Sequence, residues 1–260
     1  ALHPLEVRHH PTCNMGTCFS YRKPISDIPV PLPLDCVRID PASAQRQEAI
    51  DLIAKSFAGT AKSAPEGSTD WMLGPQLQGK WDDPRRTIFL KWMTSINFGT
   101  ILDCDGGFAI GAKAASGPLE AVLLVKPVLD GKGMCKDTHD TSANMSPPPQ
   151  GQLGDASAGI MKRMMAVDTC VSEVKAKYVP ERYLYVSMLG VDPGCQGKGF
   201  ASKLMRFCNA LADHYNAACW LETLGTRNKK IYERYGYKAM EQYPFKCEDD
   251  PDKSECPKDA

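Results

Sequence analysis

The stretch Gln196-Gly197-Lys198-Gly199-Phe200-Ala201 lies between two segments with different patterns. Before it, Tyr183 to Val191 is rich in β-branched and aromatic residues and has the period of two that is typical of a strand. Asp192-Pro193 ends this strand. After the stretch, one side of a helix is predicted to carry Ala201, Leu204, Met205 and Cys208. A glycine-rich turn therefore joins a strand to the N-terminus of a helix.

The period of two predicts which side chains of the strand share a face. Leu184, Val186 and Met188 are expected on one face of the sheet.

A turn of this kind suits a diphosphate group. Its backbone N–H groups have no partner within the helix, they point at one spot, and the helix dipole favours negative charge there. Glycine is needed because a Cβ would block the close approach of the backbone or disfavour a positive φ. The spacing does not fit the P-loop, and Gly197 and Gly199 are followed by Ser202 where the dinucleotide fingerprint needs a third glycine.

A second pattern follows downstream. Ala218 to Glu222 is predicted as a strand, and Thr226 is a suitable N-cap for a short helix. Gly236 is placed to end that helix. The predicted helix holds Asn228, Ile231, Tyr232 and Tyr235.

Together these motifs resemble those of the GNAT acyltransferase superfamily. Its pyrophosphate loop, Gln/Arg-x-x-Gly-x-Gly/Ala, is matched by Gln196, Gly199 and Ala201, and the preceding Val191-Asp192-Pro193 is also typical of the family. The run Asn228 to Tyr237 is similar to the second family motif, in which an Asn precedes a Tyr by four residues and a Gly-aromatic pair follows. The two motifs occur in the family's order.

This resemblance implies an α/β (α+β) chain with the GNAT fold. Its sheet would be mixed, mostly antiparallel and twisted, with about six to seven strands flanked by helices. The fourth and fifth strands of such a fold splay apart, and the pantetheine arm of acetyl-CoA lies in the gap. The residues that the resemblance assigns to acetyl-CoA binding are Leu189, Val191, Gln196, Gly197, Lys198, Gly199, Phe200, Ala201 and Asn228.

The resemblance also implies a direct attack of the amine on the thioester in a ternary complex. The N–H of Val191 would polarise the thioester carbonyl, because a fixed backbone dipole stabilises the charge that develops there. Tyr232 matches the family's acid, which protonates the departing thiolate; the alternative is a tyrosine that only packs its ring. Glu222 is our choice of base, with a surface ion pair as the alternative.

Three further residues near these motifs have alternative interpretations. Asn228 would contact the cofactor arm or cap its helix. Lys198 would meet a phosphate or remain solvated. Cys195 lies in the same loop, but no histidine partner is indicated, so it is not predicted to be a nucleophile.

The resemblance divides the chain into three parts. Residues 1–35 form an extended, proline-rich arm, which is either an inert leader or a segment that contacts the domain or a protein partner. Residues 36–243 form the acyltransferase domain, with an insertion at about 127–158. Residues 244–260 form a polar tail.

Hydrophobic periodicity predicts the elements of the first half of the domain. Thr60 to Asp83 is expected to be a loop. The predicted elements are a strand at Cys36 to Ile39, a helix over 41–58, a helix that begins at Asp83-Pro84, two strands at Gly107 to Lys113 and Leu119 to Lys126, and a helix from Ile160 to about Lys177.

Composition narrows the partners. Lys plus Arg equals Asp plus Glu, at 31 each in 260 residues, which gives no field for nucleic acid. The longest aliphatic run, Ala121 to Val125, is far below the roughly 20 residues of a transmembrane helix. The chain begins at Ala1 with no signal pattern, so we expect a cytoplasmic protein, or an organelle protein after N-terminal processing.

No metal site is predicted. The eleven cysteines form no C-x-x-C pair, and most are expected to be small buried hydrophobes. The densest group is His9, His10, Cys13 and Cys18, which is better interpreted as part of a disordered tail than as a zinc site, because a second cysteine pair is missing.

The predicted function is that of an N-acetyltransferase. It would move an acetyl group from acetyl-CoA to a primary amine, and the neutral charge favours a small-molecule amine over a basic peptide as the acceptor. The acceptor pocket would come from residues 41–100. The alternative is a non-catalytic GNAT-fold subunit that serves as a scaffold in a larger assembly through its arm and tail.

Overall fold

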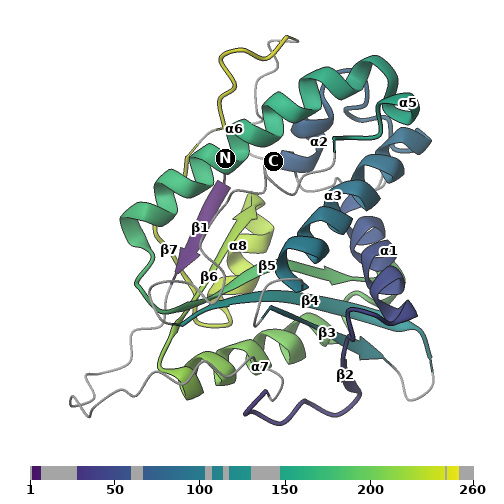
Figure 1. The fold of residues 1–260 in the computed structure, drawn as a ribbon. Coiled ribbons are helices and arrows are strands. Elements are labelled where there is room, and N and C mark those ends of the chain that lie inside the picture. Colours follow the sequence, from purple (N-terminus) through teal and green to yellow (C-terminus); the bar gives the residue numbers. More distant parts are fainter. Residues whose placement is uncertain are drawn as a thin grey trace.

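The fold is built on one mixed sheet covered by helices on both faces (Figure 1). The computed structural model describes residues 2–6, 28–59, 67–102, 107–113, 117–129, 147–243 and 245–251. The helices above the sheet come before β5 in the chain, and the helix beneath it, α7, follows β5.

Within the ranges just given, seven strands form the sheet in the order β2-β3-β4-β5-β6-β1-β7. Their bounds are β1 Leu2–Glu6, β2 Cys36–Arg38, β3 Phe108–Lys113, β4 Leu119–Val128, β5 Tyr183–Val191, β6 Ala218–Leu224 and β7 Lys238–Ala239. Neighbours pair antiparallel except β5 and β6, which are parallel. The prediction of a mixed, mostly antiparallel sheet flanked by helices is therefore confirmed.

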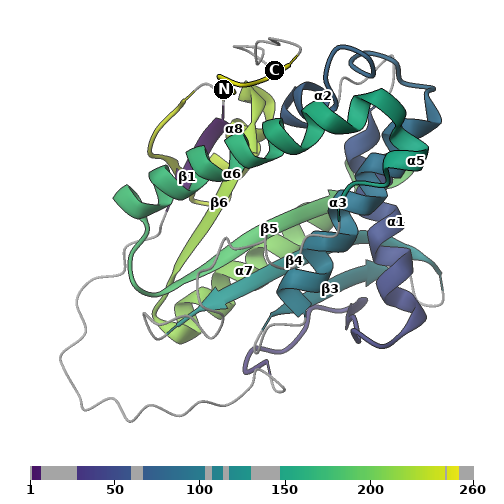
Figure 2. The same ribbon diagram turned by 45° about the horizontal axis from the view of Figure 1, so that its top comes forward.

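The helices form two layers. Figure 1 shows α7 beneath the sheet and α1, α3 and α6 above it, and Figure 2 shows α6 crossing over the strands. The helices are α1 Ala44–Ala58, α2 Gly67–Leu73, α3 Pro84–Leu102, α5 Gln150–Leu153, α6 Ser157–Tyr178, α7 Phe200–Tyr215 and α8 Gly225–Glu233. Two 3₁₀ turns are η1 Gly154–Ala156 and η2 Pro193–Cys195.

Each face of the sheet has its own apolar core. Side chains of α1, α3 and α6 pack with Trp220 on one face, and Leu204, Phe207 and Leu211 of α7 pack with Leu221 on the other. Trp220 and Leu221 are neighbours in β6, so the two cores follow from the alternation of side chains along a strand. The amphipathic pattern that predicted α1, α3, α6 and α7 thus corresponds to real buried faces.

A bulge in β5 breaks the period of two that the sequence predicts. Met188 pairs with Leu124, but Val186 pairs with Val125, so Ser187 is an extra residue on β5. Met188 consequently lies in the core above the sheet, whereas Val186 lies in the core below it. The prediction that Met188 shares a face with Leu184 and Val186 was wrong, because a bulge shifts the alternation by one residue.

Among the elements that were not predicted, two lie in segments that were interpreted as an arm and a loop. Leu2–Glu6, within the predicted arm, forms β1 and pairs with both β6 and β7. Gly67–Leu73, within the predicted loop, forms α2. Both are short, and their stability comes from neighbouring elements rather than from a local pattern. The boundaries of the arm, domain and tail stay predictions, and residues 7–27 lie outside the described part of the chain.

The insertion predicted at 127–158 begins and ends inside regular structure. Strand β4 continues to Val128, and α5 and η1 precede α6. The segment 130–146 is not among the residues that the structure describes. Helix α6 itself spans Ser157–Tyr178 and confirms the helix that was predicted from Ile160.

The start of the predicted tail packs against α2 and α6. Phe245 stacks on Trp71 of α2, with 5.6 Å between the ring centroids. Arg163 of α6 is fully buried; its Nη1 donates to Asp250 Oδ1 at 2.7 Å, and its Nε donates to the carbonyl of Met72 at 3.0 Å. Both side chains of this ion pair are 1% exposed. The chain after Tyr243 therefore completes the layer above the sheet.

We predict that Asp250→Ala destabilises the fold by about 3–5 kcal/mol, because it leaves a buried guanidinium without its counter-charge. Urea unfolding followed by circular dichroism measures the loss. The matched control is Asp249→Ala, which removes an exposed carboxylate that pairs with Lys162 of the same helix. Equal losses in the two variants would contradict the assignment.

Candidate functional site

Strands β5 and β6 pair only at the start of β5. The parallel pairs run from Tyr183 with Ala218 to Tyr185 with Trp220, and β5 then continues to Val191 alongside β4 (Figure 2). Beyond Tyr185, the edge of β5 that faces β6 has no strand partner in the described sheet. This splayed edge is the centre of the candidate site, since unpaired backbone groups need another partner.

The direction of the backbone groups on this edge follows from one hydrogen bond. The N–H of Asp192 donates to the carbonyl of Glu120 at 2.8 Å, so Asp192 faces β4. Because backbone groups alternate along a strand that pairs antiparallel, the N–H groups of Val191 and Leu189 point the other way, toward the gap. These are the two residues of β5 that the sequence assigned to the cofactor arm.

The glycine-rich turn follows at the end of the same strand. Gly197 and Gly199 have φ values of +81° and +87°, a region that favours glycine, and Gly199 is the N-cap of α7. A Cβ built on either residue meets nothing within 4 Å, so the turn is open. Within the described chain, the N–H groups of Gly199, Phe200 and Ala201 donate to no protein acceptor. The corner therefore presents unoccupied amides at a helix N-terminus.

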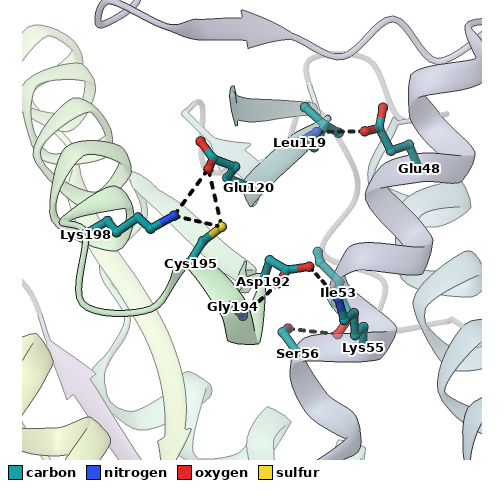
Figure 3. Close-up of polar contacts among 10 residues, drawn as sticks. All are labelled: Glu48, Ile53, Lys55, Ser56, Leu119, Glu120, Asp192, Gly194, Cys195 and Lys198. Atoms are coloured by element: carbon teal, nitrogen blue, oxygen red, sulfur yellow. Dashed lines mark hydrogen bonds and ion pairs between the residues drawn. The ribbon is translucent and has the colours of Figure 1, made fainter. Parts of the chain in front are cut away.

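Asp192 holds the base of this turn (Figure 3). Its Oδ1 accepts from the N–H of Gly194 at 2.8 Å, and its Oδ2 accepts from Lys55 Nζ of α1 at 2.7 Å. The hydrogen bond from Lys55 and then that from Gly194 hold the pKa of Asp192 below its ordinary value. The turn is thus tied to α1 as well as to β5.

Helix α1 also approaches the end of β5 closely. A Cβ on Gly190 would lie 2.6 Å from Ser56 Oγ and 3.2 Å from the Cα of Ile53. Only glycine permits this approach, because the second contact is with backbone. The end of β5 is therefore packed against α1, while the edge of β5 that faces β6 stays open.

A polar cluster lies on the β4 side of the turn (Figure 3). Cys195 Sγ donates to Glu120 Oε1 at 3.3 Å, and Lys198 Nζ lies 3.5 Å from that sulfur and 3.8 Å from the same carboxylate oxygen. The side chain of Lys198 is thus turned toward Glu120. Its predicted contact with a phosphate stays a prediction, as does that of the exposed Gln196.

The second motif lies on α8. The ring of Tyr232 packs edge-on against Tyr235 and Tyr237, with centroids 6.4 and 6.0 Å away. Its carbonyl accepts from the N–H groups of both tyrosines, and the side chain is half-buried. Asn228 is half-buried on the same helix. The roles assigned to these two residues stay predictions.

Glu222 lies against aromatic donors on the upper face of the sheet. Its carboxylate accepts from the indole N–H of Trp220 and from the hydroxyl of Tyr185. Burial, and then the charge and hydrogen bond of Glu222, hold the pKa of Tyr185 well above its ordinary value. Glu222 is therefore connected to the strand that splays, and its role as the base stays a prediction.

A cavity of about 200 Å³ lies between α3, α6 and the upper face of β4 and β5. Tyr185 and Ser187 of β5 line it, so it reaches the strand whose other edge is open. The acceptor pocket predicted from residues 41–100 stays a prediction; α3, within that range, supplies one wall of this cavity. A second wall comes from α6 and includes Asp168. Charged residues within apolar runs, such as Lys126 and Asp168, were the sequence signal available for such a cavity.

Two absences apply to the described residues alone. Among them, there is no group of three or more His, Cys, Asp or Glu residues arranged to hold a metal ion. Residues His9, His10, Cys13 and Cys18, considered above for zinc, lie outside them. Within the same ranges, no helix has the length and apolarity required to span a bilayer.

Residues 161–239 match the family model described as an acetyltransferase (GNAT) domain. No curated protein matches the sequence. The match covers the turn, α7, β6 and α8, and so includes both motifs on which the resemblance rests.

Several solved structures are similar in fold. One is a histone acetyltransferase HPA2 and related acetyltransferase from Corynebacterium glutamicum, at 17% identity and a TM-score of 0.50 over 81% of this chain and 88% of that one. Another is the C-terminal condensation domain of Ebony in complex with beta-alanyl-dopamine. It has 14% identity and a TM-score of 0.52, over 82% of this chain and 85% of that one. A polyamine N-acetyltransferase of Drosophila melanogaster has 18% identity and a TM-score of 0.46, over 85% of this chain and 92% of that one. The family model thus confirms the predicted GNAT resemblance, and the first of these structures confirms the fold.

We predict that Asp192→Asn lowers the stability at pH 7 by about 0.5 kcal/mol, because Asn keeps the cap but loses the partly exposed ion pair with Lys55. The pKa of Asp192 is lowered on folding, so its contribution is present above the unfolded value of about 3.9 and is lost as the pH falls through the folded value. Urea unfolding from pH 7 to pH 3.5 should therefore show the two proteins converging in acid. Lys55→Met should give a similar loss, and a gap that stays constant with pH would refute the assignment.

Proposed function

We propose that this chain, which carries a GNAT acetyltransferase domain, transfers an acetyl group from acetyl-CoA to a primary amine. The observation that carries the proposal is the open corner at Gly199, where unoccupied amides at the start of α7 lie directly after a strand edge without a partner. The unoccupied amides would bind a diphosphate, and the open strand edge would pair with the amide-containing pantetheine arm.

Acetyl-CoA would bind along this edge in an extended form. The diphosphate lies on the turn from Gln196 to Ala201, where backbone N–H groups and the dipole of α7 favour negative charge. The arm then lies in the gap between β5 and β6 and pairs with backbone groups of Leu189 and Val191, in the manner of an added strand. Asn228 of α8 contacts the arm from the β6 side.

The chemistry starts with the removal of a proton from the acceptor ammonium. The ammonium gives its proton to the oxygen of Tyr185, while the hydroxyl proton of Tyr185 passes to Glu222. The raised pKa of Tyr185 keeps the hydroxyl protonated, so that it is available for this relay. Glu222 is thus the base, and Tyr185 connects it to the cavity.

The neutral amine then attacks the thioester carbon. The new C–N bond forms while the carbonyl oxygen gains negative charge, which the N–H of Val191 stabilises from a fixed position. The C–S bond breaks, and the thiolate takes a proton from the hydroxyl of Tyr232. The nitrogen loses the extra proton that it carries after the attack and becomes the neutral amide, and this proton restores the hydroxyl of Tyr232. The products are the amide and CoA, and Glu222 releases to solvent the proton that came from the ammonium.

The scaffold alternative rested on the arm and the tail. In the described residues, Leu2–Glu6 pairs within the chain's own sheet, and Phe245 and Asp250 pack on its own helices. These segments therefore have structural roles inside the domain, and the catalytic proposal is the better supported one. A protein partner for the arm stays a prediction.

We predict that Gly199→Val lowers the affinity for acetyl-CoA by more than about tenfold, because a branched side chain opposes the positive φ and projects into the amide corner. Isothermal titration calorimetry measures the affinity. Gly79→Val is the matched control, since Gly79 also has a positive φ of +69° and open space but lies far from the turn in sequence. Unchanged affinity in the folded Gly199 variant would count against the proposed binding mode.

We predict that Tyr232→Phe and Glu222→Gln each lower kcat by about 10²-fold or more, because each removes a proton-transfer group. Thiol release from acetyl-CoA with a panel of amines measures turnover. Tyr235→Phe is the control for Tyr232, since it removes a neighbouring hydroxyl of the same aromatic cluster. Binding of acetyl-CoA without turnover of any amine would instead favour the scaffold.

A further inference from the structure

We infer that the glycine-rich turn carries a modification site, in which Cys195 takes an acetyl group from a thioester in solution and passes it to the amine of Lys198. The inference goes beyond the proposed function, because the acceptor is a side chain of the chain itself. The reaction occurs on the β4 side of the turn rather than in the gap between β5 and β6. Its support is the cluster of Cys195, Lys198 and Glu120 in Figure 3.

The cluster is accessible to a dissolved reactant. Cys195 is half-buried, and the side chains of Lys198 and Glu120 are 55% and 17% exposed. Cys208 and Cys219, by contrast, are buried in the core beneath the sheet. A thioester from solvent can therefore reach the sulfur of Cys195, whereas those two thiols are shielded from it.

The sulfur of Cys195 has a proton acceptor and a positive charge beside it. Its thiol donates to Glu120 Oε1 at 3.3 Å, and Lys198 Nζ lies 3.5 Å from the sulfur. The thiolate is the form that attacks a thioester, and a neighbouring ammonium stabilises it. The sequence indicated no histidine base for Cys195. The carboxylate of Glu120, which lies 75 residues earlier in the chain, takes that place.

The first step moves the acetyl group to Cys195. The thiol gives its proton to Glu120, and the sulfur attacks the carbonyl carbon of acetyl-CoA. The new C–S bond forms, the bond to the CoA sulfur breaks, and the CoA thiolate takes the proton from Glu120. One thioester replaces another, so the step needs no oxidant and no further reactant.

The second step moves the acetyl group from sulfur to nitrogen. The ammonium of Lys198 gives a proton to Glu120, whose Oε1 lies 3.8 Å from Nζ. The neutral amine then attacks the acetyl carbon on the neighbouring sulfur, and proximity favours this intramolecular step. The C–N bond forms and the C–S bond breaks. The extra proton of the nitrogen restores the thiol of Cys195, and Glu120 releases its proton to solvent.

The modification changes the charge of the turn. An acetylated Lys198 has no positive charge and no ion pair with Glu120. The lost charge belongs to the residue before Gly199, the N-cap of α7. The acetylated turn is therefore less favourable to an anion than the unmodified one.

The test measures the rate of acetylation at each lysine by mass spectrometry of peptides, after incubation of the full chain with acetyl-CoA. Lys55 is the internal control, since its side chain is 61% exposed and its amine pairs with the carboxylate of Asp192 rather than with a thiol. We expect Lys198 to be acetylated at least about tenfold faster than Lys55, because the acetyl group is delivered from the adjacent sulfur. Equal rates at the two lysines would overturn the inference.

Two variants separate the two steps. Cys195→Ser keeps a hydroxyl but removes the sulfur, so acetylation of Lys198 should slow by at least about tenfold. Lys198→Arg keeps the positive charge but provides no acetyl acceptor, so a thioester that neutral hydroxylamine cleaves should accumulate on Cys195. Acetylation of Lys198 that persists at the same rate in Cys195→Ser would overturn the inference. A Lys198→Arg protein that carries no thioester on Cys195 would do the same.

A second donor distinguishes this inference from the proposed function. S-acetyl-N-acetylcysteamine has a thioester but no diphosphate, so it does not depend on the amides at the start of α7. We expect it to acetylate Lys198 too, at a rate that falls in Cys195→Ser, even if calorimetry finds no binding of acetyl-CoA. A lack of acetylation with both donors overturns the inference and leaves the transfer to free amines unaffected.

Discussion

The parting of β5 from β6 after Tyr185 is the constraint on which the rest of the site depends. A strand edge inside a sheet normally satisfies its N–H and C=O groups through its neighbour, and leaving them unpaired is costly once water is excluded. Here the edge of Leu189 and Val191 is held open because β5 is fixed elsewhere. Strand β4 pairs along its opposite edge, and α1 packs on its face at Gly190. The gap is therefore maintained by packing elsewhere rather than by its own contacts.

The two faces of the sheet carry different parts of the candidate site. The lower face carries α7, whose first amides have no protein acceptor in the described part of the chain, and the upper face carries the cavity and the contact between Tyr185 and Glu222. The bulge at Ser187 lies between these two regions. The extra residue turns Met188 to the upper face and Leu189 to the lower face, the reverse of what unbroken alternation from Tyr185 would give.

The features that could be predicted from the sequence depend on residues that lie close together in the chain. The glycines at 197 and 199 and the apolar face of α7 are recognisable because a positive φ and a helical period act within a few residues. The bulge at Ser187 has no such signature, and neither has β1, whose pairing partner Leu224 is distant in sequence. The cavity between α3, α6 and the sheet could not be derived either, since its α6 wall is placed only when that helix crosses over the sheet.

The burial of Arg163 has a consequence for how the chain reaches its final state. Its counter-charge, Asp250, lies 87 residues later in the sequence. During synthesis the helix that forms a wall of the cavity emerges long before that carboxylate, and its guanidinium must stay hydrated until then, because a lone buried charge is strongly unfavourable. The layer above the sheet is thus expected to close late, after β5, α7 and β6 have already been made.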